Sequence, residues 1–108
     1  MSSPVPPSPQ GSGVRLLSDY GAESPTWVGG VMVSPEHLSV SAPLATRLRR
    51  WQQHFVDHFD VDHGWDSDTA REWYRVEAEG LVEDLRAELD PDVRLTVDLW
   101  PLEPPSEA

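Results

Sequence analysis

A periodic row of apolar side chains in the middle of the chain constrains its fold more than any other feature. These residues recur at steps of three and four along 42–59, which places them on one side of an α-helix. Ser41 supplies an N-cap, and Pro43 fits the first turn. One apolar face must be buried against another layer, so the pattern predicts a packed core. The row consists of Leu44, Leu48, Trp51, Phe55 and Phe59.

A second helix is predicted after a short loop. Asp66 or Ser67 would cap it, and Asp68 lies in its first turn, where the helix dipole favours an acid. Gly80 lies inside this helix and suggests a close approach by the first one. Pro91 ends it. Its apolar face consists of Ala70, Tyr74, Ala78, Leu81 and Leu85, with Trp73 and Leu89 at the borders.

Three segments outside these helices have the character of strands. Residues 14–17 and 26–33 are apolar and bounded by turn residues, with Gly29 and Gly30 marking a bulge or a turn. Residues 93–100 alternate between apolar and polar side chains, as a half-buried strand does. The order β-β-α-α-β predicts an α+β fold: a small β-sheet of about three strands with two helices packed on one face. The last strand could pair with the first or the second, in either sense.

The length of 108 residues fits one domain. We expect a disordered N-terminal segment at 1–13, a single α+β domain at 14–100 and a flexible acidic tail at 101–108. The chain contains no cysteine, which excludes disulfides and cysteine zinc sites. No signal peptide or membrane-spanning run is visible, so the sequence predicts a cytoplasmic protein.

The negative charge is concentrated in the second half of the chain. The net charge is −11, and residues 57–108 hold sixteen acids against four arginines. Such a field repels nucleic acid and anionic membranes and attracts basic partners. Lysine, isoleucine and asparagine, whose codons are rich in A and T, are absent from the sequence, which suggests a GC-rich bacterial genome.

The stretch HFVDHFDVDHGWDSD at 54–68 raises two metal hypotheses. His54 and His58 have the i, i+4 spacing of zinc ligands, and His63 would be a third ligand. However, the first two fall on the border of a packed helix, and no HExxH arrangement is present. An aspartate skeleton resembling a calcium loop departs from that pattern where arginine occupies its closing position. That skeleton consists of Asp60, Asp62, Asp66 and Asp68.

An ordinary loop between two packed helices explains most of the same residues. In this interpretation Gly64 permits the turn, Trp65 packs back ahead of the second helix, and the following acids cap it. No phosphate-binding glycine loop or nucleophile elbow occurs. The sequence therefore predicts a protein that is not an enzyme and needs no cofactor, with a metal-dependent enzyme using the 54–68 cluster as a weaker alternative.

Several short motifs carry a family resemblance. They are Asp19-Tyr20-Gly21 near the front, the aromatic row ending in Phe59, Gly64-Trp65-Asp66-Ser67, and the closing Asp98-Leu99-Trp100-Pro101. This combination resembles a group of small acidic actinobacterial proteins, over about residues 14–102. The resemblance implies a cytoplasmic bacterial protein and indicates no activity.

Small size, acidity and the lack of a cofactor motif favour a protein-binding module of the antitoxin or immunity type. Its acidic face would capture a basic protein partner, because complementary charges speed association. The alternative is a structural or regulatory companion protein whose acidity serves solubility only. The predicted partner-binding residues are Asp57, Asp60, Asp62, Trp65, Glu72, Glu79, Glu83 and Trp100.

Overall fold

A computed structural model describes residues 13–102, so the predicted disorder at 1–12 and the tail at 103–108 lie outside the described residues. The first half contains β1 (Val14–Leu17), β2 (Thr26–Val28), β3 (Val31–Val33), η1 (Pro35–Leu38) and α2 (Ala42–His58). The second half contains β4 (Phe59–Asp60), β5 (Gly64–Trp65), α3 (Asp68–Glu88), β6 (Leu95–Asp98) and η2 (Trp100–Leu102).

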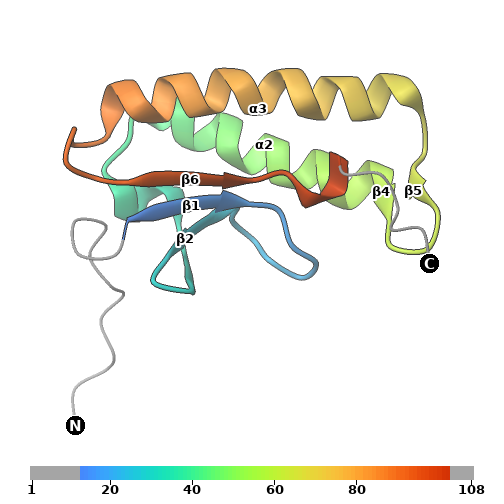
Figure 1. Ribbon diagram of the computed structural model, residues 1–108, viewed down its shortest axis with the longest axis horizontal. Coiled ribbons are helices and arrows are strands. Elements are labelled where there is room, and N and C mark those ends of the chain that lie inside the picture. The colour runs from blue at the N-terminus through green and yellow to red at the C-terminus, as the bar shows by residue number, and fades with distance from the viewer. Residues whose placement is uncertain (1–12, 103–108) are drawn as a thin grey trace, which may run out of the picture.

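Four strands form one mixed sheet in the order β3-β2-β1-β6. Neighbours β1 and β2, and β2 and β3, are antiparallel, whereas β1 and β6 are parallel. Both long helices lie on the same face of this sheet (Figure 1). The predicted α+β fold, a small sheet with two helices on one face, is confirmed, and the open question of the last strand is answered by its parallel pairing with β1.

The prediction of one strand at 26–33 is wrong, because this segment forms a hairpin. Gly29 and Gly30 both adopt positive φ, 59° and 79°, and reverse the chain between β2 and β3. Tight hairpin turns need positive φ at their central residues, which glycine accepts without a steric penalty. A second, two-stranded sheet of β4 and β5 that the sequence did not predict joins α2 to α3.

Both helices begin at the predicted caps. The Ser41 hydroxyl accepts the Leu44 N–H over 3.3 Å, and the Ser67 hydroxyl accepts the Ala70 N–H over 3.0 Å. Each cap satisfies a backbone donor that the first turn leaves without a partner. Of the two candidates for the second cap, Ser67 rather than Asp66 occupies the position.

The core lies between the helices and the sheet. Trp51 and Tyr74 stack with ring centroids 4.4 Å apart, and the Trp51 indole donates to the Tyr74 carbonyl over 3.0 Å. Phe55 and Leu81 are fully buried beside them, which confirms the predicted core positions. The Tyr74 hydroxyl donates to Ser18 over 2.8 Å, and burial raises the pKa of Tyr74.

Two acids of α3 form ion pairs with an arginine of α2. Arg47 forms ion pairs with Glu77 and Asp84 across the helix interface. A Cβ added to Gly80 would lie 3.1 Å from the Arg47 guanidinium, so the glycine makes room for this side chain. These acids join the two helices and leave less charge for a partner.

The end of the domain extends beyond the predicted boundary at residue 100. The predicted strand at 93–100 is shorter in the structure, where β6 ends at Asp98. Pro101 is buried in η2, and the Leu102 N–H donates to the Leu99 carbonyl over 2.9 Å. The first two residues of the predicted tail therefore belong to the packed domain.

Candidate functional site

An aromatic cluster packs under the amino-terminal end of α3. The Phe59 ring lies 5.1 Å from Trp65 and 5.4 Å from Trp100, measured between centroids. The Trp65 indole donates to the Pro101 carbonyl over 2.9 Å, and the Trp100 indole donates to the Ser18 carbonyl over 2.7 Å. Both predicted aromatic anchors are thus half-buried, with their N–H groups used inside the molecule.

A different tryptophan is presented to solvent at this end. Trp73, which the helical pattern placed at the border of the apolar face, is 41% exposed. Its ring packs on His54 with centroids 4.3 Å apart, and His54 packs on His58 at 4.5 Å. A hydrogen bond of 2.8 Å from His54 Nε2 to the Ala70 carbonyl fixes the imidazole. Trp73 is therefore an exposed aromatic side chain with a fixed support.

The three histidines of the cluster do not form a common ligand set, although the rings of His54 and His58 lie side by side. His54 bonds to a backbone carbonyl, His58 Nδ1 lies 2.8 Å from Asp66, and His63 lies 3.5 Å from Asp60 in the exposed turn. Across residues 13–102, no three His, Cys, Asp or Glu side chains gather closely enough to hold a metal ion. The zinc and calcium hypotheses therefore have no preformed ligand set in the part of the chain that the structure describes.

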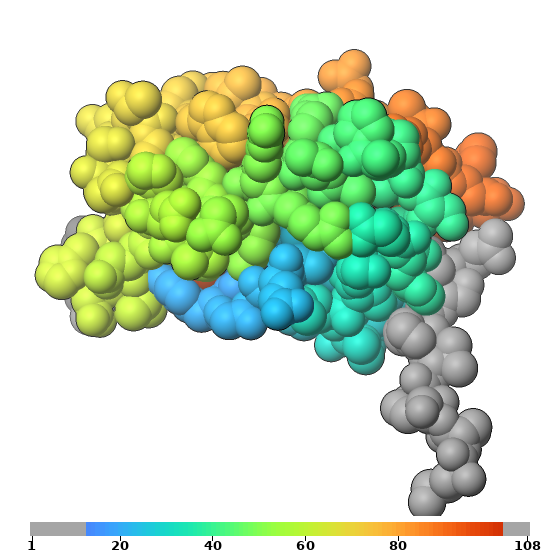
Figure 2. Space-filling view, turned by 180° about the vertical axis from the view of Figure 1, so that it is seen from behind, coloured from blue at the N-terminus to red at the C-terminus, as the bar shows by residue number. Residues whose placement is uncertain are grey.

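Three of the predicted acids lie at the end of α2 and in the turn that follows it. Asp57 accepts a hydrogen bond from Gln53 over 2.9 Å. Asp60 accepts the Asp62 N–H over 2.7 Å, and this backbone bond, aided by His63, lowers the pKa of Asp60. Figure 2 shows the turn (yellow-green) protruding at one end of the molecule, beside the start of α3 (yellow). These acids are exposed at the same end as the aromatic cluster.

The other three predicted acids follow the outer side of α3. Arg75 pairs with both Glu72 and Glu79, and its hydrogen bond to Glu72 lowers the pKa of that carboxyl. Glu83 is exposed, and its carboxylate makes no hydrogen bond or ion pair with residues 13–102. From Glu72 to Glu83 the helix rises about 16 Å. This row is therefore long and partly neutralised, whereas the acids of the turn lie closer together.

The sequence did not predict that Trp73 is exposed, or that acids of α3 form ion pairs with Arg47 and Arg75. A border position on a helix becomes exposed or buried according to how the neighbouring helix crosses it, which the pattern of one helix does not contain. The available signal was the position of Trp73 directly before the buried Tyr74, at the border of the apolar face. A residue at such a border can be either exposed or half-buried.

The fold alone defines no function, because one fold can carry many of them. An exposed tryptophan is typical of a surface that binds another protein, since aromatic residues are enriched at such interfaces. The chain matches the model of the family described as Serratia CdiI immunity protein-like over residues 12–98, and it belongs to that family. A comparison with curated proteins found no match.

Membership in this family confirms the predicted immunity-like, protein-binding role at the level of the class and agrees with a role that is not enzymatic. The acidic face, the basic partner and the resemblance to actinobacterial proteins stay predictions. No helix within residues 13–102 has the length and apolar character needed to span a bilayer.

Proposed function

We propose that this chain is an immunity protein that binds a toxin protein through the surface around Trp73. We define the Trp73 surface as Trp73, His54, His58 and Asp66 together with the turn acids Asp57, Asp60 and Asp62. Family membership supports the immunity role. The exposed Trp73, held against His54, is the observation that carries the choice of surface.

The chemistry of this surface suits a basic partner. Tryptophan is enriched among residues that dominate binding energy, and it acts best when its orientation is fixed before binding. The chain of contacts from Trp73 through His54 and His58 ends at Asp66, and so joins the ring to an acid. A lysine or arginine could pack its aliphatic part on the Trp73 ring and pair its charge with these acids.

The two tryptophans predicted as anchors have a supporting role in this proposal. Trp65 and Trp100 pack beneath the turn, and their indoles tie it to the Pro101 and Ser18 carbonyls. Their replacement would disturb the turn and with it the positions of Asp60 and Asp62. We propose the α3 acids Glu72, Glu79 and Glu83 as a flank that contributes long-range attraction.

The first test compares charge reversal at the surface with equal reversal elsewhere. The double variant Asp57→Lys, Asp62→Lys and the control Glu23→Lys, Asp92→Lys change the net charge by the same amount. With the toxin protein that co-purifies with the native chain as the probe, we expect the first variant to weaken binding by about tenfold or more at low salt, and the control to change it little. Calorimetric titration of purified toxin measures both affinities.

Trp73→Ala tests the aromatic anchor separately. Loss of a central tryptophan typically costs about 2 kcal/mol or more of binding free energy, or about thirtyfold in affinity. The melting temperature should fall only moderately, because Trp73 is 41% exposed and lies outside the buried core, with its ring packed on His54. Equal binding by all of these variants would leave the alternative, a companion protein whose acidity serves solubility only.

The flank has its own test. The triple variant Glu72→Lys, Glu79→Lys, Glu83→Lys should slow association with the toxin most strongly at low salt, since exposed charges act within a Debye length of about 8 Å at physiological ionic strength. An unchanged association rate at low salt would remove the α3 row from the proposed surface.

A further inference from the structure

The outer side of β6 is an unpaired strand edge. In the sheet order β3-β2-β1-β6, no strand of residues 13–102 pairs with the side of β6 that faces away from β1. The Val14 N–H donates to the Arg94 carbonyl over 2.8 Å, and Val14 is in register with Leu95. Backbone groups alternate in direction along a strand, so those of Thr96 also face β1, whereas those of Leu95 and Val97 face outward.

This alternation makes the edge complementary to itself. If two copies of β6 run antiparallel about a two-fold axis at Thr96, Leu95 of one copy lies opposite Val97 of the other. Both residues point their N–H and C=O groups outward, and an antiparallel hydrogen-bonded pair exchanges both of them. The axis repeats this pair, so the arrangement satisfies every outward backbone group of Leu95 and Val97 in both copies.

The charges of the strand have the same symmetry. With the axis at Thr96, Arg94 of one copy lies directly opposite Asp98 of the other, and this also occurs twice. Arg94 is exposed and has no ion pair within residues 13–102, and Asp98 is half-exposed beside Arg15 at 2.6 Å. Opposite charges directly across two antiparallel strands attract, and like charges at these places repel.

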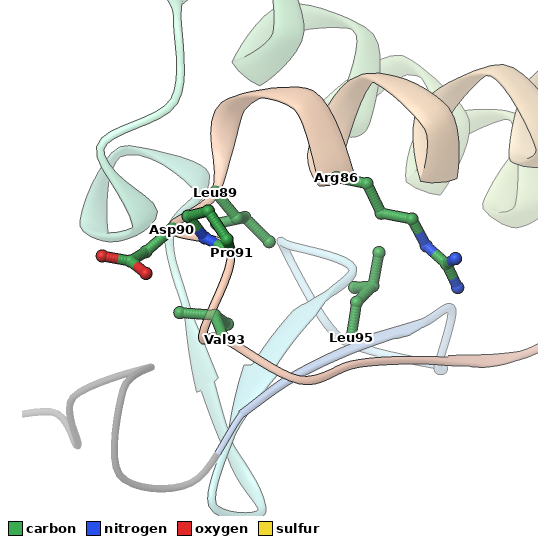
Figure 3. A pocket seen from close by; sticks show the side chains of 6 residues that line it. All are labelled: Arg86, Leu89, Asp90, Pro91, Val93 and Leu95. Carbon is green, nitrogen blue, oxygen red and sulfur yellow. The ribbon is translucent and has the colours of Figure 1, made fainter.

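A hollow lined by both aliphatic and charged side chains lies beside the same edge. It has a volume of about 320 Å³ and lies between the end of α3 and the start of β6. Figure 3 shows Leu95 pointing from the strand towards the helix and Arg86 extending from the helix towards the strand. In the two-fold arrangement Leu99 of the second copy lies opposite Val93, one of the hollow's lining residues.

The arrangement also separates the most acidic parts of the two copies. β6 runs along α3 in the opposite direction, from the carboxyl end of the helix towards its amino end (Figure 1). When two β6 strands run antiparallel about the axis at Thr96, the amino ends of the two α3 helices point away from each other. The acidic turns beside these ends are therefore also far apart. This lowers the repulsion that the net charge of −11 imposes on two copies.

We propose that two copies of this chain associate through antiparallel pairing of their β6 edges about an axis at Thr96. The occupant of the edge is a second copy, because the directions of the backbone hydrogen bonds and the pairing of Arg94 with Asp98 agree at one register. A two-fold axis is the commonest symmetry of protein dimers. The Trp73 surface stays open in both copies, so this proposal is independent of the proposed function.

The sharpest test uses the absence of cysteine from the sequence. Directly opposite residues that do not exchange backbone hydrogen bonds have Cα atoms about 4.5 Å apart, within the range of about 4.4–6.8 Å that a disulfide spans. Thr96→Cys should therefore form a disulfide-linked dimer rapidly under mild oxidation. Met32→Cys, an exposed position on the opposite edge strand β3, is the matched control and should cross-link slowly.

Sedimentation across a range of concentrations provides the second measurement. The native chain should dimerise as its concentration rises, and Arg94→Asp should weaken the dimer about tenfold or more by placing like charges opposite each other. Arg50→Asp makes the same change in net charge on α2 and should leave the dimer unchanged.

The proposal would be overturned by a chain that stays monomeric at high concentration, by a Thr96→Cys variant that cross-links no faster than Met32→Cys, or by a dimer that Arg94→Asp does not weaken. Protection of the Val97 amide from hydrogen exchange that appears only after toxin is added would assign the edge to another protein and would also overturn it.

Discussion

The two ends of α3 differ in how their surroundings are filled. At the amino end, aromatic rings pack tightly beneath the helix, and acids and Trp73 face outward. At the carboxyl end, a hollow lined by aliphatic and charged side chains lies beside an edge of β6 that no strand of residues 13–102 pairs with. The first end presents exposed acids and an aromatic ring, whereas the second presents backbone groups and a hollow lined by aliphatic and charged side chains. One helix of 21 residues thus separates two surfaces of different chemistry.

The largest expected effect is on stability at the amino end. Phe55 is fully buried and contacts several rings of the cluster, so Phe55→Ala should cost about 3–5 kcal/mol of the free energy of unfolding. Leu89→Ala is the matched change at the other end. Because Leu89 borders an existing hollow, its truncation should cost less, about 2 kcal/mol. Urea unfolding measures both, and equal losses would contradict the contrast in packing.

An effect of high pH should be next in size, and it too belongs to the amino end. Burial raises the pKa of Tyr74 above the ordinary tyrosine value of 10.0. Folding therefore favours the neutral form of the Tyr74 hydroxyl. The contribution of this group to the free energy of unfolding is complete below about pH 10 and is lost as the pH rises through the folded-state pKa. We expect the free energy of unfolding to fall above about pH 10, by up to about 1.4 kcal/mol per pH unit.

Comparison of Tyr74→Phe with Tyr20→Phe shows which tyrosine causes the loss of stability above about pH 10. Tyr74→Phe should abolish most of the alkaline slope, at a constant cost of about 0.5–1.5 kcal/mol for the lost hydrogen bond to Ser18. Tyr20 is exposed, and its pKa is raised by partial burial and by the acids Asp60 and Asp62. Tyr20→Phe should keep most of the slope, and the reverse result would mean that Tyr74 ionises without unfolding the amino end.

The sequence predicted the helices well because their signals are local. Four of the apolar positions from Leu44 to Phe55 are buried as expected, and Ser41 and Ser67 cap as their residue types indicate. The strand character of 26–33 was predicted, but the hairpin was not, because Gly29-Gly30 within one apolar run fits a bulge and a turn equally well. The antiparallel pairing of β2 with β3 shows that the two glycines form a turn.

The surfaces were harder to predict because they depend on contacts between distant segments. The ion pairs of Glu77 and Asp84 with Arg47 depend on how α2 packs on α3, which the sequence pattern of either helix does not contain. Trp100 looked like an exposed member of an alternating strand, but η2 turns it inward to Ser18. The parallel partner of β6, and hence its unpaired edge, follows from sheet order, which no local pattern contains.

The smallest expected effect is that of metal ions on the cluster at the amino end. Purified protein should contain no stoichiometric zinc or calcium, and adding either ion should leave the melting temperature unchanged. The physical reason is that His54 and His58 already bond to the Ala70 carbonyl and to Asp66, while His63 is 83% exposed in the turn. A metal would have to break these bonds and move the turn before binding.

Elemental analysis after gentle purification and thermal melts with each ion check this expectation together. A bound ion at a hundred times its dissociation constant would stabilise the fold by about 2.7 kcal/mol, which a melt detects readily. The control is His54→Gln, His58→Gln, which removes the imidazoles. One ion per chain, or a stabilisation by zinc that this double variant abolishes, would show that the turn rearranges into a metal site. The amino end of α3 would then be a metal-dependent surface instead of one that binds its partner through Trp73 and exposed acids alone.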